Sequence, residues 1–450
     1  MHYELIIKNG TIVTPEKSFK GDVAINGGKI VLTGVLDPQD TADDIYDANS
    51  LHVLPGIIDA HVHFRDPGLT EKEDFETGSI AAAMGGVTMI ADMPNVIPVT
   101  STKERFEEKI KTAKEKSFVD FALFALLTND NLKEMQGLIN AGAFGFKVFF
   151  GASTGEIACP SAEVLIKQMD YRCKTDNGSL RIGFHAETNE INVNFTDIAK
   201  READALDGFW LDYCRPVISE VNAINDIITY ASHTGAKIHI HHITSFDGIQ
   251  LVQEAKGKGI NVTAETCPHY LLFDANTDTH KVYPPIRDEE HQDSLWEAIN
   301  NKTIDIIASD HAPHTAAEKS LPLWEAPAGL SGVETFVPLM LNQVNNGKLT
   351  INDFVHLASE SPAMIWGIYP RKGNLLPGAD ADITIVDMNA KKIIKAGELH
   401  SKSKTSAYDG MEVKGIPVAA IVRGKFVMKG GRLTGNKGYG AFIKPILNFS

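Results

Sequence analysis

Eight short apolar segments recur through the middle of the chain, and helical patterns separate most of them. The segments are Pro55–Ala60, Val87–Asp92, Val119–Ala125, Phe144–Phe150, Arg181–Ala186, Lys237–His242, Ile260–Glu265 and Ile304–Ser309. Short apolar runs of this kind are typical of buried parallel strands. Helical patterns lie between them, for example over Thr102–Lys116, Ser161–Cys173 and Val221–Ser232. Eight such units over about 310 residues favour a closed (β/α)8 barrel over an open sheet, because a closed barrel needs that number.

The two ends of the chain share a different pattern of short strand-like runs. In the N-terminal region these runs are interrupted by Asn9-Gly10 and Gly27-Gly28, which are turn signals of β-hairpins. Residues 381–387 and 418–424 repeat the pattern near the C-terminus. We therefore expect an α/β protein in which a (β/α)8 TIM-type barrel carries a small β-sandwich domain built from both termini. The predicted ranges are residues 55–370 for the barrel and residues 1–54 plus 371–450 for the β domain.

Charge and composition exclude several classes of partner. The formal net charge of −15 argues against a nucleic-acid or anionic-membrane surface, since both require a basic patch. No apolar stretch approaches the ~18 residues that span a bilayer, and no secretory signal is visible. The four cysteines are widely spaced and contain no Cys-x-x-Cys, which favours reduced thiols. We expect a cytoplasmic protein without nucleic-acid or membrane partners.

Histidines and one aspartate stand where several predicted strands end. His61 and His63 follow the first strand, and residues two apart in a strand point to the same side. The other residues of this kind at strand ends are His185, His239, His241, His242 and Asp310. Catalytic groups of such barrels lie at the carboxyl ends of the strands, so these side chains are expected to converge. Imidazole and carboxylate groups favour a divalent metal, zinc above all.

Lys147 lies within the apolar strand Phe144–Phe150 and allows two interpretations. Burial of its cation is costly, so the side chain either reaches an edge of the strand or pairs with an acid. Alternatively, the neutral amine captures carbon dioxide and forms a carbamate, an anionic group able to bridge two metal ions. The histidines at neighbouring strand ends favour the carbamate.

Further motifs follow the first histidine pair along the chain. The motifs are His61–Gly68, Asp92–Asn95, Ser309–His314, Gly329–Thr335, Leu376–Asp382 and Ser401–Lys404 with Asp409-Gly410. Together they resemble the amidohydrolase superfamily, and within it the dihydroorotases, over nearly the whole chain and in the expected order. The first motif, with arginine and Pro-Gly after the histidines, is typical of cyclic-amide hydrolases.

This resemblance implies a centre of two zinc ions bridged by carboxylated Lys147 and a hydroxide. His61, His63, Lys147 and Asp310 would hold one ion, and Lys147, His185 and His242 the other. His239 and His241 would then have packing or supporting roles. Asp310 would also act as the catalytic proton shuttle between the attacking hydroxide and the ring nitrogen.

The resemblance also implies the substrate, N-carbamoyl-L-aspartate or L-dihydroorotate, which dihydroorotase interconverts in pyrimidine synthesis. Arg65, Asn95 and His314 would hold its carboxylate, and Tyr283 and Gly329 would complete the substrate site. A planar guanidinium suits a carboxylate through two parallel hydrogen bonds. The expected partner is this small-molecule substrate. Assembly into a homo-oligomer is a further possibility.

Two departures from the family pattern keep alternatives open. Many bacterial dihydroorotases carry aspartate where Lys147 stands, whereas the lysine form is shared with hydantoinases and allantoinases. Related dihydroorotases also have asparagine before Pro-Pro-Leu-Arg, whereas this chain has Tyr283 before Pro-Pro-Ile-Arg. Allantoinase or dihydropyrimidinase/hydantoinase activity is therefore the main alternative. The second alternative is a barrel without catalytic activity that serves as an assembly partner, although all six ligand positions hold residue types that bind metal.

Overall fold

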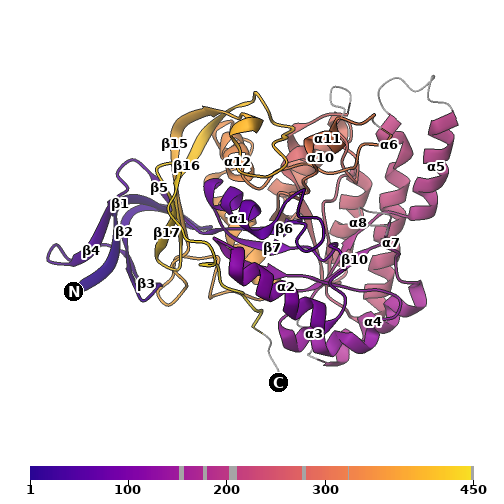
Figure 1. Cartoon of the computed structure of the whole chain (residues 1–450), viewed down its shortest axis with the longest axis horizontal. Helices are drawn as coiled ribbons and strands as arrows, with labels where there is room; N and C mark the ends of the chain where they lie inside the picture. Colours follow the sequence, from indigo (N-terminus) through magenta and orange to yellow (C-terminus); the bar gives the residue numbers. More distant parts are fainter. Residues whose placement is uncertain (152–156, 176–179, 202–209, 276–279, 323, 447–450) are drawn as a thin grey trace.

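The computed structural model describes residues 1–151, 157–175, 180–201, 210–275, 280–322 and 324–446. Its centre is a ring of parallel strands, part of which is visible in the middle of the molecule in Figure 1. The strands are β6 (Ile57–Val62), β7 (Val87–Asp92), β8 (Asp120–Leu123), β9 (Ala125–Leu126), β10 (Phe146–Phe149), β11 (Ile182–His185), β12 (Ile238–Ile240), β13 (Val262–Thr266) and β14 (Ile306–Ile307). Only Phe124 separates β8, which pairs with β7, from β9, which pairs with β10, so the two occupy one strand position. A parallel bridge between Val62 and His311 closes the ring, and the predicted (β/α)8 barrel is confirmed.

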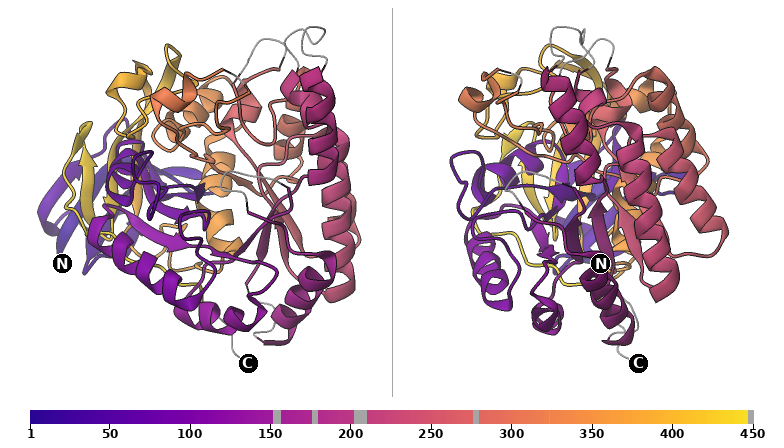
Figure 2. Two further views of the ribbon diagram at one scale, coloured as in Figure 1. Left: turned by 45° about the vertical axis from the view of Figure 1, so that its right-hand side comes forward. Right: turned by 90° about the vertical axis from the view of Figure 1, so that its right-hand side faces the viewer.

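Helices surround this ring, as the two views of Figure 2 show. They are α1 (Phe75–Met84), α2 (Lys103–Lys116), α3 (Met135–Ala141), α4 (Ala162–Thr175), α5 (Asn189–Arg201), α6 (Trp210–Cys214), α7 (Val217–Thr234), α8 (Phe246–Gly257), α9 (Pro268–Leu272), α10 (Glu289–Asn300), α11 (Ala316–Lys319), α12 (Phe336–Asn345), α13 (Ile351–Val355) and α14 (Ser361–Ile365). Helix α2 illustrates their construction. The Thr102 side chain accepts a hydrogen bond from the Arg105 backbone N–H and caps the helix, while Phe106 and Ala113 are buried against the barrel.

The β-rich domain is one sheet with strands from both ends of the chain. The strands are β1 (His2–Val13), β2 (Ser18–Asn26), β3 (Lys29–Gly34), β4 (Thr41–Asp47), β5 (His52–Pro55), β15 (Ile383–Ile393), β16 (Glu412–Val422), β17 (Lys425–Lys429) and β18 (Arg432–Leu433). Strand β5 pairs with β1 on one side and with β15 on the other, and so joins the two halves. A composite β domain was expected, and its exact residue limits stay a prediction.

The two glycine-containing turn signals have different outcomes. Gly27-Gly28 forms the turn between β2 and β3, as predicted. The prediction of a turn at Asn9-Gly10 is wrong, because both residues lie inside β1, where the pairing with β2 shifts register. Asn9 has φ of 65°, which is the left-handed conformation that asparagine tolerates, so the same residue pair produces a bulge instead of a turn.

A buried cluster of charges joins the barrel to the β-rich sheet. Lys372 is 1% exposed, and its ammonium lies 2.7 Å from the carboxylate of Asp120 on β8 and also contacts Asp382 beside β15. Arg423 adds a second contact to Asp120 at 3.1 Å. These ion pairs connect residues far apart in the chain and fix the sheet against the barrel.

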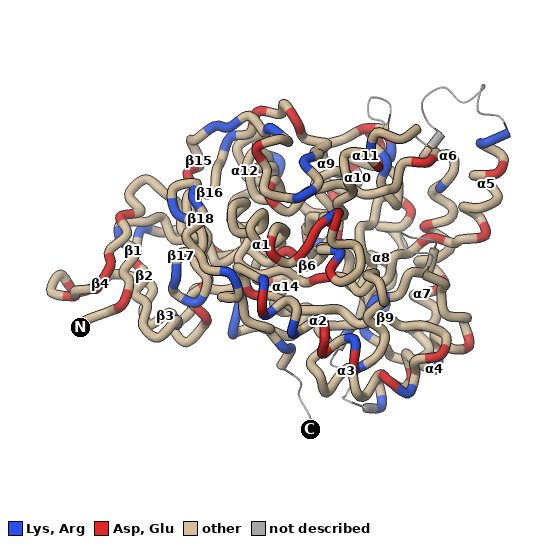
Figure 3. Tube along the Cα trace, in the orientation of Figure 1, with Lys and Arg blue, Asp and Glu red and all other residues tan. Residues whose placement is uncertain are grey.

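Charged residues of both signs are spread along the outer elements (Figure 3). Helices α4 and α5 each carry acidic residues in the first turn and basic residues in the last, which complements the helix dipole. Among the described residues, every helix is too short or too polar to cross a membrane.

Candidate metal centre and active site

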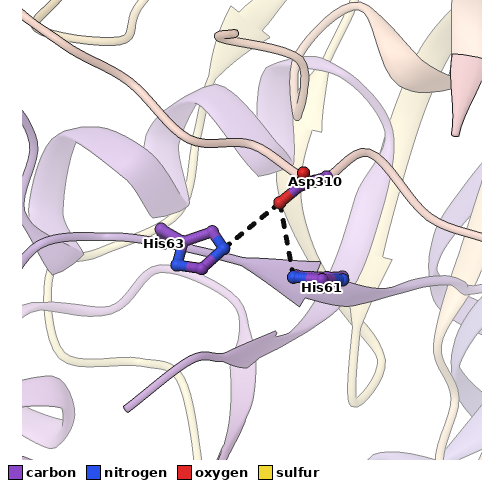
Figure 4. A group of neighbouring side chains, drawn as sticks. All are labelled: His61, His63 and Asp310. Atoms are coloured by element: carbon purple, nitrogen blue, oxygen red, sulfur yellow. Dashed lines mark hydrogen bonds and ion pairs between the residues drawn. The ribbon is translucent and has the colours of Figure 1, made fainter. Parts of the chain in front are cut away.

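His61 and His63 meet Asp310 where the barrel closes (Figure 4). Nε2 of His61 lies 3.3 Å from Oδ1 of Asp310, and Nε2 of His63 lies 3.2 Å from the same atom. His61 lies near the end of β6, His63 directly follows this strand, and Asp310 follows β14. The first and the last strand of the barrel thus bring these three residues together. One candidate ligand atom of each lies within 4.8 Å of the other two.

Lys147 lies in the middle of β10 and is completely buried. Its amine has no hydrogen-bond partner among the described residues and lies 5.1 Å from the centre of the Phe149 ring. Burial of Lys147 excludes an exposed position at the edge of the strand. No acidic side chain among the described residues forms a hydrogen bond with its amine either. Burial lowers the pKa of Lys147 from 10.5 to about 7, so a large fraction of the amine is neutral at physiological pH.

His185 and His242 form the other side of the site. Nδ1 of His185, at the end of β11, lies 3.1 Å from Nε2 of His242, which follows β12. The ring of His242 is also 5.4 Å from the ring of His61, between centroids. Burial is the main cause that lowers the pKa of His242 well below its ordinary value, so the ring is held in the neutral form that binds metal.

All six predicted ligands line one cavity: His61, His63, Lys147, His185, His242 and Asp310. Two of them, His242 and Asp310, have positive φ values of 37° and 44°. Such backbone conformations are costly for residues other than glycine and concentrate at functional sites. The cavity volume of about 30 Å³ has room for about two water molecules.

Neighbouring polar groups fix the orientation of three of the histidine rings. Nδ1 of His61 contacts Glu265, and Nδ1 of His63 donates to Oδ1 of Asn95 at 2.6 Å. These contacts leave Nε2 of each ring directed at Asp310. His185 uses the opposite nitrogen, because its Nε2 lies 2.6 Å from Oε2 of Glu187 and its Nδ1 faces His242. A carboxylate or amide behind a histidine ring is the usual support of a metal ligand.

The donor atoms of the cavity suit divalent metal ions. Nε2 of His61 and Nζ of Lys147 are buried and have no hydrogen-bond partner among the described residues. Nδ1 of His185 presents a lone pair to Nε2 of His242, since its proton lies on the side of Glu187. Unsatisfied buried nitrogens are costly without a ligand, and a metal ion satisfies them. The residues present therefore fit the expected centre.

The residues predicted to hold a substrate carboxylate do not all reach the cavity. Arg65 and Asn95 line it, and Nη1 of Arg65 has no hydrogen-bond partner among the described residues. His314 is not among the lining residues: its Nε2 donates to the carbonyl of Ala328 at 3.0 Å, and its Nδ1 accepts from Lys72 at 3.3 Å. Burial, followed by Arg65, lowers the pKa of His314 to about 2. A neutral ring in this position adds no positive charge for a carboxylate.

Tyr283 and Gly329 form part of the cavity wall, where substrate contacts were predicted. Gly329 has φ of 139°, and a Cβ atom there would lie 2.4 Å from the carbonyl oxygen of Ala312, so only glycine fits. In the stretch from His311 to Leu330, the two end residues pair with each other. The stretch also contains the short helix α11, which begins with a Thr315–Glu318 capping box.

Sequence reasoning missed two carboxylates that support the site. Glu265 and Glu187 are both completely buried. Glu265 contacts three rings, His61, His239 and His241, and this gives the latter two the supporting role expected of them. The available signal was an acid inside the predicted strand Ile260–Glu265, and an acid two residues after His185.

Comparisons with known proteins agree with this architecture. The model of the "Amidohydrolase family" matches residues 52–427. An allantoinase from Deinococcus radiodurans is 35% identical over 99% of this chain and 99% of its own length. An L-hydantoinase from Paenarthrobacter aurescens is 34% identical over 98% of each chain. The solved L-hydantoinase (dihydropyrimidinase) from Arthrobacter aurescens superimposes with a TM-score of 0.94 at 33% identity, covering 98% of this chain and 100% of that one.

The fold and the arrangement of histidines define a hydrolase barrel of the amidohydrolase type. This chain belongs to the amidohydrolase family, and its relatives place it among the cyclic amidohydrolases. The predicted superfamily is thus confirmed. These three relatives are named allantoinase and hydantoinase, so they favour the alternative drawn from the sequence over dihydroorotase.

Proposed function

We propose that this protein hydrolyses the ring amide bond of a cyclic ureide of the hydantoin class, the class that includes allantoin. The observation that carries the proposal is the single cavity that gathers His61, His63, Lys147, His185, His242 and Asp310. Relatives named allantoinase and L-hydantoinase, aligned over nearly their whole length, support a hydantoin ring as the substrate. A cytoplasmic location and a homo-oligomeric assembly stay predictions from the sequence.

Two zinc ions are the proposed cofactors. His61, His63 and Asp310 would hold one ion, His185 and His242 the other, and Lys147 would contribute to both. When bound, such ions supply a water nucleophile at neutral pH and polarise the substrate carbonyl. The neutral amine of Lys147 would add carbon dioxide and lose a proton, which gives a carbamate with two anionic oxygen ligands.

Asp310 is the proposed proton shuttle. Burial opposes its ionisation, but the contact with His63 and nearby positive groups hold the pKa of Asp310 below its ordinary value. The carboxylate is therefore ionised at neutral pH and ready to accept a proton from the attacking water. It then returns this proton to the ring nitrogen that leaves when the amide bond breaks.

The substrate-binding residues favour a neutral ring over dihydroorotate. Of the three residues predicted for a carboxylate, Arg65 alone has a buried donor without a partner among the described residues. The amide oxygen of Asn95 accepts from His63, and Nε2 of His314 donates to the carbonyl of Ala328. Arg65 would instead donate to a ring carbonyl oxygen, which needs one donor rather than a complete clamp.

A turnover assay on protein of known metal content tests this proposal. The rates of hydrolysis of hydantoin, dihydrouracil and L-dihydroorotate are compared side by side. The reverse reaction, ring closure, is measured with the open-chain product of each compound. We expect hydantoin to be hydrolysed with the highest kcat/KM. Turnover of dihydroorotate and carbamoyl-aspartate alone would return the assignment to dihydroorotase, and no turnover of any cyclic amide by metal-loaded protein would refute the proposal.

A further inference from the structure

A second pocket adjoins the metal cavity on the outside. It has a volume of about 440 Å³ and lies between helix α5 and the segments around Lys281 and Ala328. Tyr283 and Ala328 line both the inner cavity and this outer pocket. The two pockets therefore share one wall, and a shift of Tyr283 would let a substituent on a ring bound in the inner cavity reach the outer pocket.

Asn192 gives the outer pocket its chemical character. It lies on α5 and lines the pocket, yet its side chain is only 3% exposed. Neither Oδ1 nor Nδ2 of this side chain has a hydrogen-bond partner among the described residues. A buried amide without partners is destabilising, and such groups in native proteins call for an explanation. A ligand that forms these bonds provides one.

The position of Asn192 is fixed by the metal site itself. Helix α5 begins two residues after Glu187, whose carboxylate binds His185 and also forms two hydrogen bonds with Arg215, at 2.9 and 2.5 Å. The guanidinium of Arg215 in turn stacks on the ring of Tyr283, 3.7 Å from its centroid. The ion pair between Glu187 and Arg215 therefore positions both Tyr283, which separates the two pockets, and the start of α5.

The donor and acceptor of an amide restrict the group that fits. A urea or carboxamide group offers both N–H donors and a carbonyl acceptor, so it satisfies Oδ1 and Nδ2 of Asn192 together. A carboxylate would satisfy Nδ2 alone and leave Oδ1 unpaired, and an alkyl group would satisfy neither. Lys200 and Lys281 also line the pocket, and their charge favours a carbonyl oxygen beside them.

We propose that the outer pocket binds a urea- or carboxamide-type substituent on the cyclic substrate, with Asn192 as the specificity-determining residue. This inference rests on the proposed hydrolysis of hydantoin rings. It narrows the substrate to a hydantoin whose ring carbon carries such a group, for example 5-ureidohydantoin, which is allantoin. Hydantoins with alkyl side chains are then poor substrates.

The test compares substrates that differ only in the substituent. 5-Isobutylhydantoin has the same branched shape as allantoin without its polar atoms, 5-carboxymethylhydantoin carries an anion, and unsubstituted hydantoin leaves the outer pocket unused. We expect kcat/KM for allantoin to exceed that for the isobutyl and carboxymethyl compounds by at least about 10-fold, because a site built for hydrogen bonds rejects analogues that lack them.

The variant Asn192→Leu removes both polar atoms and keeps the number and branching of the side-chain heavy atoms. It should lower kcat/KM for allantoin by about 10- to 100-fold and leave unsubstituted hydantoin nearly unchanged, which also shows that the variant is folded. Asn192→Asp, which removes the donor, should lower allantoin turnover as well. Asn194→Leu is the matched control, since Asn194 lies on the same helix but is exposed, and allantoin turnover should not change.

Several outcomes would overturn the inference while the proposed function stands. They are equal turnover of allantoin and 5-isobutylhydantoin, a preference for the carboxymethyl compound, or an equal loss on allantoin and hydantoin in Asn192→Leu. An Asn192→Leu variant as active on allantoin as the native protein would also overturn it. Failure to hydrolyse any hydantoin would instead refute the proposed function and this inference together.

Discussion

Nε2 of His185 lies 2.6 Å from Oε2 of Glu187, and this one contact decides which nitrogen of the ring faces the metal cavity. The same carboxylate is bound by Arg215, and Glu187 itself is completely buried. Burial opposes its ionisation, but Arg215 and His185 outweigh that effect and hold the pKa of Glu187 at about 2. An ionised carboxylate behind the ring makes the imidazole a stronger ligand.

Glu187→Gln should therefore weaken zinc binding at the site that contains His185. We expect about a 10- to 100-fold lower affinity, measured by zinc release to a competing chelator. Glu163→Gln, an exposed residue paired with Lys167 on α4, is the control and should bind zinc as the native protein does. Equal zinc release from both variants and the native protein would show that Glu187 does not support the metal centre.

Glu265→Gln is expected to affect both stability and metal binding. The carboxylate of Glu265 accepts from Nδ1 of His241 at 2.9 Å and from Nε2 of His239 at 3.1 Å, and it also contacts His61. An amide N–H in this place would face ring N–H groups, and a buried donor left unpaired costs about 1–3 kcal/mol. Urea unfolding of the metal-free protein measures that loss of stability. Zinc titration measures the decrease in zinc affinity that is expected when His61 becomes a weaker ligand. A variant that matches the native protein in both would contradict the role of Glu265.

Reconstitution of the metal-free protein should depend on carbon dioxide and on pH. The amine of Lys147 reacts with carbon dioxide only when neutral, and burial lowers its pKa to about 7. At a fixed concentration of dissolved carbon dioxide, the rate of reactivation by zinc should therefore rise as the pH increases through about 7 and level off above it. Lys147→Ala should lose activity and regain part of it with short carboxylic acids that replace the carbamate. Full reactivation in carbon dioxide-free buffer would exclude the carbamate.

The charge cluster between barrel and sheet predicts a pH-dependent stability. Although burial opposes ionisation of Asp380, contacts with Lys372 at 3.2 Å and Lys29 at 2.6 Å lower its pKa to about 2. The unfolded chain binds a proton near pH 3.8 and the folded chain only near 2, so this stabilisation is complete above about pH 4 and is lost as the pH falls toward 2.

Asp380→Asn should consequently lower the free energy of unfolding by about 1–2 kcal/mol at pH 7. The difference from the native protein should narrow when urea unfolding is repeated at pH 3. Asp170→Asn, which affects an exposed pair with Lys174 on α4, should have little effect at either pH. A destabilisation by Asp380→Asn of the same size at both values would show that its charge is not responsible.

The barrel was predictable because the alternation of apolar strands and helices is a local pattern, and a closed barrel requires eight such units. The convergence of these histidines and Asp310 on one cavity followed, since parallel strands place their carboxyl ends at one face and these residues stand at those ends. Asn9-Gly10 shows the limit of such local signals: its left-handed residue serves a bulge as well as a turn, and only pairing with β2 distinguishes the two.

The supports of the site and its specificity were not predictable in the same way. Glu265 reaches His61 only because strands far apart in sequence meet across the barrel, which no local pattern records. The departure at Tyr283 kept allantoinase and hydantoinase activity open as alternatives, and Tyr283 stands in the cavity wall. The motif around His314 suggested a substrate contact, whereas the folded chain uses that ring to hold Ala328.

Anomalous X-ray diffraction at the zinc absorption edge, on crystals of zinc-loaded protein, tests the central claim most directly. We predict two zinc peaks in the cavity, one beside His61, His63 and Asp310 and one beside His185 and His242, with density for a carboxylated Lys147 between them. Zinc bound elsewhere, for example at Asp120, Asp380 and Asp382, with none among these histidines, would contradict the account.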